Sequence, residues 1–239
     1  MGRGPSIEGR KNAEDAKRGK IFTKLIREIT IAARNGAEPA TNARLRAGID
    51  KALSSNMTKD TIERAVRRGS GAEGTDNMQE LRYEGYGPAG VALIIDCMTD
   101  NAQRTVADVR HALAKHGGNL GTTGSVAFQF KHIGELVFAT PGALDELRVL
   151  ELALDAGADD VQTRDGQTTV LCSVANFEAV KKALAAAKLQ PLRADVVWRP
   201  ENRVPVSGET EETLRDLLDR LEDLDDVQEV YHNAALAQE

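Results

Sequence analysis

Hydrophobic side chains recur with the period of an α-helix in the first third of the chain. Within residues 20–34 they fall on one face about 100° wide, as in a helix that packs against a core. This face consists of Phe22, Leu25, Ile26, Ile29 and Ala33. The cations Lys20, Lys24 and Arg27 fall on the opposite side of the same helix. The pattern therefore predicts an amphipathic helix with a basic outer face, which ends at Asn35 and Gly36.

Two shorter helices follow with the same period. Their apolar positions are Leu45, Ile49 and Leu53 in the first, and Ile62, Ala65 and Val66 in the second. Thr41 and Thr58 are the expected N-cap residues, because their hydroxyl groups can accept a hydrogen bond from the first helical turn. Gly69 follows the second helix at the C′ position that glycine favours. The sequence thus predicts a three-helix N-terminal domain over residues 1–77.

The period changes beyond residue 77, where short apolar or alternating segments predict strands. These segments lie at residues 91–98, 125–131, 134–140, 160–164, 168–174, 194–199, 203–206 and 227–231. Helical patterns lie between them, at 144–156, at 177–187 and around Val109 and Leu217. Asp100 and Asn101 are alternative caps for the helix around Val109.

The order of these elements predicts the fold class. Residues 132–202 contain a complete β-α-β-β-α-β series, which is the ferredoxin-like arrangement. Residues 78–131 and 203–239 each supply one β-α-β half of a second such unit. We therefore expect an α+β protein with an N-terminal three-helix domain followed by two ferredoxin-like α/β domains. The second of these, residues 132–202, is inserted into the first.

The charge of the chain also changes near the end of the predicted helical domain. Residues 1–75 carry 16 Lys and Arg against 9 Asp and Glu, although the whole chain has a net charge of −6. A localised basic surface of this kind is typical of proteins that bind a polyanion. The acidic run Glu222, Asp223, Asp225 and Asp226 is expected to be a solvated face.

Basic residues near the N-terminus and at the end of the third helix are the expected nucleic-acid contacts. They are Arg10, Lys11, Lys17, Arg18, Lys20, Lys24, Arg27, Arg64, Arg67 and Arg68. Lys and Arg clusters mostly grip phosphate, whereas base recognition also uses Asn and Gln, which the third helix lacks on its charged face. We therefore expect salt-sensitive binding of low sequence specificity, to DNA or to structured RNA.

Two glycine-rich segments are further candidates. Gly85, Gly87 and Gly90 match a dinucleotide-binding spacing, but they precede a strand and enclose Pro88, so a turn is expected instead. The second segment is a loop for phosphate or partner contact, formed by Gly118, Asn119, Gly121, Thr122, Thr123 and Gly124. Its exposed amides could hold a phosphate, and the alternative is a tight connection between a helix and a strand.

Little in the sequence indicates catalysis or cofactor binding. The four histidines have no metal-ligand spacing, and no nucleophile motif is present, so we expect a protein that is not an enzyme and holds no metal or cofactor. Cys97 and Cys172 lie in apolar runs and are expected to be buried and reduced. No apolar stretch approaches the length of a membrane span. We expect a cytoplasmic protein with no small-molecule substrate.

Segments along most of the chain resemble the YebC/PmpR family, to which the mitochondrial translational activator of cytochrome c oxidase subunit I also belongs. The resemblance begins with DAKRGKIFTK at residues 15–24. It continues at residues 44–46, 56–60, 62–65, 83–88, 99–101, 104–105, 109–111, 117–121, 124–126 and 224–228, and at Tyr231. The start departs from the family, because many members open with GHSKW where this chain has GRGPSI at residues 2–7.

The resemblance implies a helical domain followed by two α/β domains, and no catalytic residues. It also implies a cytoplasmic regulator of gene expression. Family members are described as DNA-binding transcriptional regulators or as ribosome-associated factors that relieve stalled translation. The leading hypothesis is a non-enzymatic, DNA-binding transcriptional regulator. The alternatives are a translation factor that binds ribosomal RNA on the ribosome, and a protein-docking adaptor.

Overall fold

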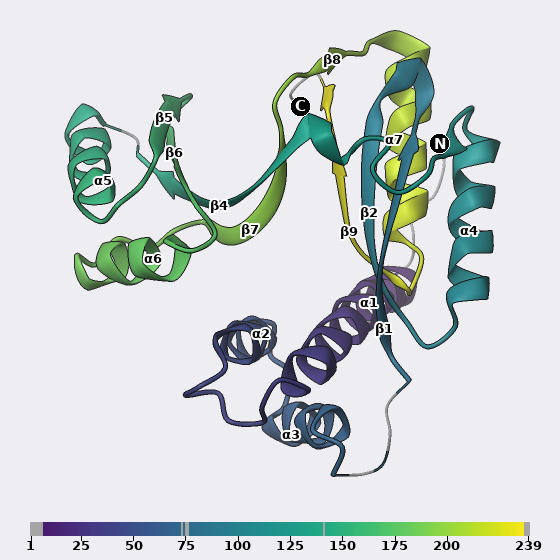
Figure 1. Cartoon of the computed structure of the whole chain (residues 1–239), viewed down its shortest axis with the longest axis horizontal. Helices are drawn as coiled ribbons and strands as arrows, with labels where there is room; N and C mark the ends of the chain where they lie inside the picture. The colour runs from purple at the N-terminus through teal and green to yellow at the C-terminus, as the bar shows by residue number, and fades with distance from the viewer. Residues whose placement is uncertain (1–6, 73, 75–76, 141, 237–239) are drawn as a thin grey trace. The chain divides into compact units, whose positions relative to one another are not determined.

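The computed structural model describes residues 7–72, 74, 77–140 and 142–236, with the side chains of residues 7–15 and 143–144 outside that description. The chain forms two compact units. The first holds the described residues up to Ser125 together with Val206–Val230 and Leu236, and the second holds Val126–Pro205 with Tyr231–Ala235. The second unit is therefore inserted into the first, and the α+β class with a helical N-terminal domain is confirmed (Figure 1).

The N-terminal domain consists of α1 (Ile7–Ala33), α2 (Ala43–Ser54) and α3 (Lys59–Gly69). Its core joins the apolar faces of the three helices, and includes the buried residues Ile29, Leu45 and Ile62. The expected cap Thr58 is confirmed, but α2 is capped by Asn42 and not by Thr41. The carbonyl oxygen of the Asn42 side chain accepts from Leu45 N, and its amide donates to the carbonyl oxygens of Ala32 and Gly36.

The first unit continues with a four-stranded sheet in the order β3-β1-β2-β9. Its elements are β1 (Gln79–Tyr86), β2 (Ala92–Thr99), α4 (Ala102–Lys115), β3 (Asn119–Leu120), α7 (Gly208–Glu222) and β9 (Val227–His232). Asn101 caps α4 through its side chain. Strands β1 and β2 form an antiparallel hairpin across the 3₁₀ turn Pro88–Gly90, so the turn expected at the glycine motif is confirmed.

Three strand predictions that concern the first sheet need correction. Strand β1 was not predicted, although Leu81 and Tyr83 alternate there with charged residues. Residues 125–131 do not form a strand of their own, because Ala127–Gln129 is a 3₁₀ turn that exposes Phe128, and Phe130 begins the next strand. The segment at 203–206 forms β8 (Val204–Pro205), which pairs with β10 (Ala234–Ala235) outside the four-stranded sheet. The first sheet therefore follows the chain order β-β-α-β-α-β.

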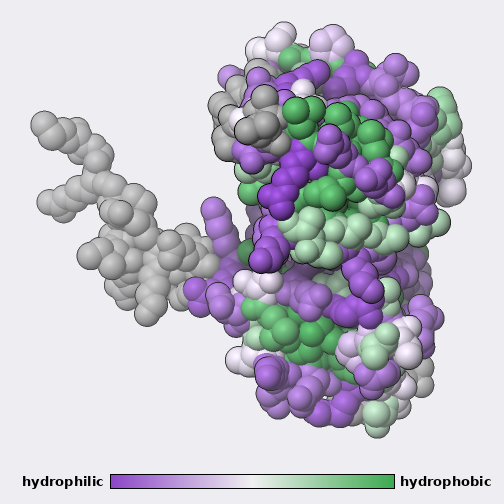
Figure 2. Space-filling view, turned by 90° about the vertical axis from the view of Figure 1, so that its left-hand side faces the viewer, coloured by the Kyte–Doolittle hydropathy of each residue, from purple (hydrophilic) through white to green (hydrophobic). Residues whose placement is uncertain are grey.

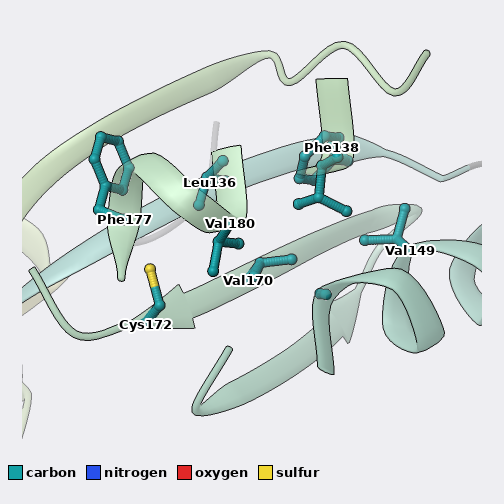
Figure 3. Packing of buried hydrophobic residues seen from close by; sticks show 9 residues of the cluster. Leu136, Phe138, Val149, Val170, Cys172, Phe177 and Val180 are labelled. Carbon is teal, nitrogen blue, oxygen red and sulfur yellow. The ribbon is translucent and has the colours of Figure 1, made fainter. Parts of the chain in front are cut away.

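The second unit has the ferredoxin-like order β5-β6-β4-β7, with antiparallel neighbours. Its elements are β4 (Phe130–Ala139), α5 (Ala143–Asp155), β5 (Asp160–Arg164), β6 (Gln167–Cys172), α6 (Phe177–Ala186) and β7 (Arg193–Pro200). Figure 3 shows how Leu136 and Phe138 of β4 pack with Val149 of α5 and Val180 of α6. The helices thus cover one face of this sheet.

Candidate nucleic-acid interface

Helix α1 presents basic side chains on the side away from its own core, as its sequence predicts. What the sequence did not predict is that three of these cations contact an acidic segment at the end of α7. We call residues 222–226 the acidic turn. Lys20 Nζ lies 2.6 Å from Asp223 Oδ1, and Lys24 Nζ donates to the carbonyl oxygen of Glu222 at 3.2 Å. These cations therefore already have acceptors within the chain.

Arg27 makes the deepest of these contacts. Its guanidinium donates to the carbonyl oxygens of Met98, at 2.8 Å, and Asp225, at 2.5 Å, and to Asp226 Oδ1 at 2.8 Å. The Arg27 side chain is 15% exposed and that of Asp226 is 7% exposed, so this ion pair is largely removed from water. Arg27 thereby joins α1 to the C-terminal end of β2 and to the turn that precedes β9.

Asp226 also binds two groups of α4. Arg104 Nε and Nη2 donate to its carboxylate at 2.9–3.1 Å, and the hydroxyl of Thr105 donates to Oδ2 at 2.8 Å. A buried carboxylate is stable only when its oxygens are well hydrogen-bonded, and Asp226 meets that condition. Of the acidic run that was expected to be solvated, Asp226 is therefore an internal residue, which links α1, α4 and β9.

The electrostatics of the acidic turn follow from these contacts. Burial by itself would raise the pKa of Asp226, but hydrogen bonds from Thr105, Arg104 and Arg27 outweigh it and hold the pKa below its usual range. The hydrogen bond from Lys20 likewise lowers the pKa of Asp223. Both carboxylates are therefore charged in the folded protein at neutral pH.

A pH dependence of stability follows from the lowered pKa of Asp226. A carboxyl group with a lower pKa in the folded chain stabilises it above the unfolded pKa of about 4, and this contribution is lost as the pH falls through the folded value. We expect the free energy of unfolding to fall on acidification below about pH 4. Urea unfolding of the native protein and of Asp226→Asn at several pH values measures this. The difference in free energy of unfolding between the two proteins should shrink as the pH falls below about 4. A difference that stays constant would contradict a lowered pKa for Asp226.

The remaining basic candidates are more exposed. Lys17 and Arg18 lie on exposed positions of α1, and Arg64, Arg67 and Arg68 on exposed positions of α3. Arg64 pairs with Asp60 at 3.0 Å, but both side chains are mostly exposed, so the pair is weak and readily exchanged. The side chains of Arg10 and Lys11 lie outside the described residues.

Lys17 and Arg18 also line a shallow groove. Ile21, Phe22 and Ser55 complete its lining, and its volume is about 310 Å³. Ile21 is half exposed despite its hydrophobic side chain. The groove therefore combines an apolar floor with two cations, which suits contact with a nucleotide as well as with phosphate alone.

The glycine-rich loop has its amides turned inward. Gly121 N donates to the carbonyl oxygen of Glu84 at 2.8 Å, Gly124 N donates to the Glu84 carboxylate at 2.8 Å, and Ser125 N donates to the carbonyl oxygen of Thr122 at 3.1 Å. A Cβ atom on Gly118 would lie 2.3 Å from the carbonyl oxygen of Tyr86, so this glycine permits close packing on β1. The geometry favours a tight connection, because these amides are occupied and a buried carboxylate lies beneath them.

In the described part of the chain, metal-ligand clusters, reactive cysteines and membrane-spanning helices are absent. No group of three or more His, Cys, Asp or Glu side chains there is arranged to hold a metal ion. Burial raises the pKa of the Cys97 thiol to about 12 and also raises that of Cys172, so neither is an activated nucleophile. No helix in the described ranges is both long and apolar enough to cross a membrane.

Comparisons with known proteins identify the class to which this fold belongs. The model of the TACO1/YebC protein N-terminal domain matches residues 4–72, and that of the TACO1/YebC second and third domain matches residues 78–234. Together they cover the helical domain and both α/β domains. The chain belongs to the TACO1/YebC family.

Individual relatives agree with this assignment. A probable transcriptional regulatory protein of Xanthomonas campestris pv. campestris is 58% identical over 236 residues, which cover 98% of this chain and 97% of the relative. Another with the same description, from Stenotrophomonas maltophilia, is 57% identical and covers 99% and 98%. The crystal structure of a conserved hypothetical protein of Aquifex aeolicus superposes with a TM-score of 0.84 at 39% identity, over 94% of this chain and 93% of that chain.

Proposed function

We propose that this protein is a cytoplasmic, nucleic-acid-binding regulator of gene expression that acts without catalysis, and that its target is DNA. The names of its relatives support a role in transcriptional regulation. The observation that carries the proposal is the set of exposed cations on the helical domain, Lys17, Arg18, Arg64, Arg67 and Arg68. These residues remain accessible after Lys20, Lys24 and Arg27 have been assigned to the acidic turn.

The assignment of Lys20, Lys24 and Arg27 changes the mechanism that charge alone suggested. The pair of Lys20 with Asp223 is largely exposed and readily exchanged, but phosphate would have to break a largely buried network to reach Arg27. We therefore assign the phosphate contacts to the exposed cations, and a structural role to Arg27. The acidic turn keeps negative charge close to α1, so nucleic acid approaches from the Lys17 and Arg18 end.

Neutralising the exposed cations of α1 tests the proposal. Each phosphate contact releases counterions, so the double variant Lys17→Ala with Arg18→Ala should bind duplex DNA about tenfold more weakly at 0.1 M salt. Its plot of log affinity against log salt should be shallower by about two units. Fluorescence anisotropy across a salt series measures both quantities. The matched control is Lys131→Ala with Lys182→Ala, which removes the same charge from exposed positions of the second unit.

The same measurement decides between the two nucleic acids. The charged face of α3 offers arginines without amide side chains, which grip phosphate on DNA or RNA alike and keep the ribosomal alternative open. Duplex DNA and a structured ribosomal RNA fragment are compared at physiological salt. Binding of the RNA with no binding of the DNA would reject the transcriptional role and favour the translation factor. An unchanged affinity of the double variant for both would reject these cations as the contact.

A further inference from the structure

Helix α5 carries leucines on its outer side. Leu147 is 52% exposed and Leu154 is 51% exposed, while Leu150 between them is half-buried. The spacing of three and four residues places them on one stripe of the helix, about 10 Å long. Val149 and Ala153 lie about 110° further round the helix and are buried in the core of the unit. Helix α5 therefore has two apolar faces, of which the core uses one.

The outer stripe borders a groove. Leu147 and Leu150 of α5, with Glu146, form one wall, and Val161 and Thr163 of β5 form the other. The volume of the groove is about 310 Å³. Strand β5 is at the edge of its sheet, so the groove lies open along the rim of the second unit. Figure 2, which faces the side that carries α5 in Figure 1, shows hydrophobic surface set among hydrophilic residues.

Acidic side chains flank this apolar stripe. Glu146 lines the groove on one side of it, and Glu151 and Asp155 are exposed along α5 on the other side. The one cation in the described part of α5 is Arg148, whose guanidinium donates to the carbonyl oxygen of Ala187 at 2.8 Å. The surface thus has an apolar centre and a negatively charged rim.

We propose that the groove between α5 and β5 binds a basic amphipathic helix of another protein. Such a helix places an apolar face with leucine-like spacing against Leu147, Leu150 and Leu154, and its Lys and Arg side chains against the acidic rim. The complementary charge selects the partner class, because an acidic or neutral helix would leave the rim carboxylates opposed or unpaired. The site lies in the second unit and uses none of the cations assigned to nucleic acid, so it goes beyond the proposed function.

Two synthetic helical peptides with the same leucine face test the proposal. One carries lysines and the other glutamates on the polar face, and binding of each to the full-length protein is measured by fluorescence anisotropy. We expect the lysine peptide to bind and the glutamate peptide to fail. Leu147→Asp and Leu154→Asp should each weaken the lysine peptide at least about tenfold, equivalent to about 1.4 kcal/mol. Their unfolding transitions should change little, because both residues are half exposed.

The aspartate variants separate the groove from general attraction to a negatively charged protein. Each adds a negative charge, so a purely electrostatic association with the lysine peptide would become tighter. Leu192→Asp is the matched control, because Leu192 is 62% exposed in the same unit but precedes β7, at the other edge of the sheet from β5 and away from the leucine stripe. Equal effects of all three substitutions would overturn the proposal. So would self-association of the native protein in sedimentation that Leu147→Asp abolishes, because a second copy would then be the occupant.

Discussion

Replacing Asp226 by asparagine is expected to lower the free energy of unfolding by about 3 kcal/mol. The substitution keeps the size of the side chain but removes the charge that faces Arg27 and Arg104. Removing one partner of a buried ion pair leaves the other charge without compensation, which costs more than the pair itself contributes. Arg104 is about half exposed and can regain water, so the effect belongs at the lower end of the range for buried pairs.

Urea unfolding at neutral pH measures this effect, with Asp225→Asn as the control. Asp225 carries the same charge one residue earlier, and it is exposed, so its change should stay within about 0.5 kcal/mol. Arg27 donates to the backbone carbonyl oxygen of Asp225 and not to its carboxylate, so the control leaves this contact in place. Equal losses in the two variants would show that the buried network does not hold α1 on the sheet.

Replacing Gly69 by alanine is expected to destabilise the helical domain by about 3 kcal/mol. A Cβ atom at this position would lie 1.9 Å from the carbonyl oxygen of Thr30 and 2.9 Å from Cβ of Ala33. These atoms belong to the backbone and to a short side chain of α1, so neither can turn aside. The last turn of α3 must therefore move away from α1, and buried contacts of the domain are lost.

A glycine-to-alanine substitution elsewhere in the domain should have the opposite effect on stability. Gly19 lies in α1, and a Cβ atom there would meet nothing within 4 Å. Gly19→Ala should stabilise the protein by up to about 1 kcal/mol, because alanine favours the helical backbone. Thermal or urea unfolding of the two variants measures the contrast. A neutral Gly69→Ala would mean that the helices do not cross as closely as the structure has them.

The role of Gly69 shows what a local sequence pattern cannot predict. Its position after two arginines is typical of a helix C′ glycine, and that was the prediction. In the structure Gly69 is the last residue of α3, and Ser70 is the C-cap. The glycine is needed because the backbone of Thr30, 39 residues earlier in the chain, occupies the space of a side chain. A pattern within one helix contains no information about such a neighbour.

The candidate site likewise contains residues that the sequence identifies and residues that only the structure reveals. The exposed cations Lys17 and Arg18 could be named from the sequence, because a polar face of an amphipathic helix stays accessible wherever nothing covers it. The partners of Lys20, Lys24 and Arg27 could not, because the acidic turn lies about 200 residues further along the chain. Asp226 and Arg104 were missed for this reason. The only available signal was that Asp226 directly precedes the apolar strand β9.

By itself the sequence determined the α-helices except the start of α1, the cap residue Thr58, the ferredoxin-like element order of the second unit and the family. These depend on side-chain period and on contacts between near neighbours, which one linear pattern contains. Only the tertiary structure decided that β1 and not residues 203–206 completes the first sheet, and that the basic and acidic parts of the chain partly neutralise each other. Strand partners and ion pairs depend on which distant segments meet, and this is set by packing of the whole chain.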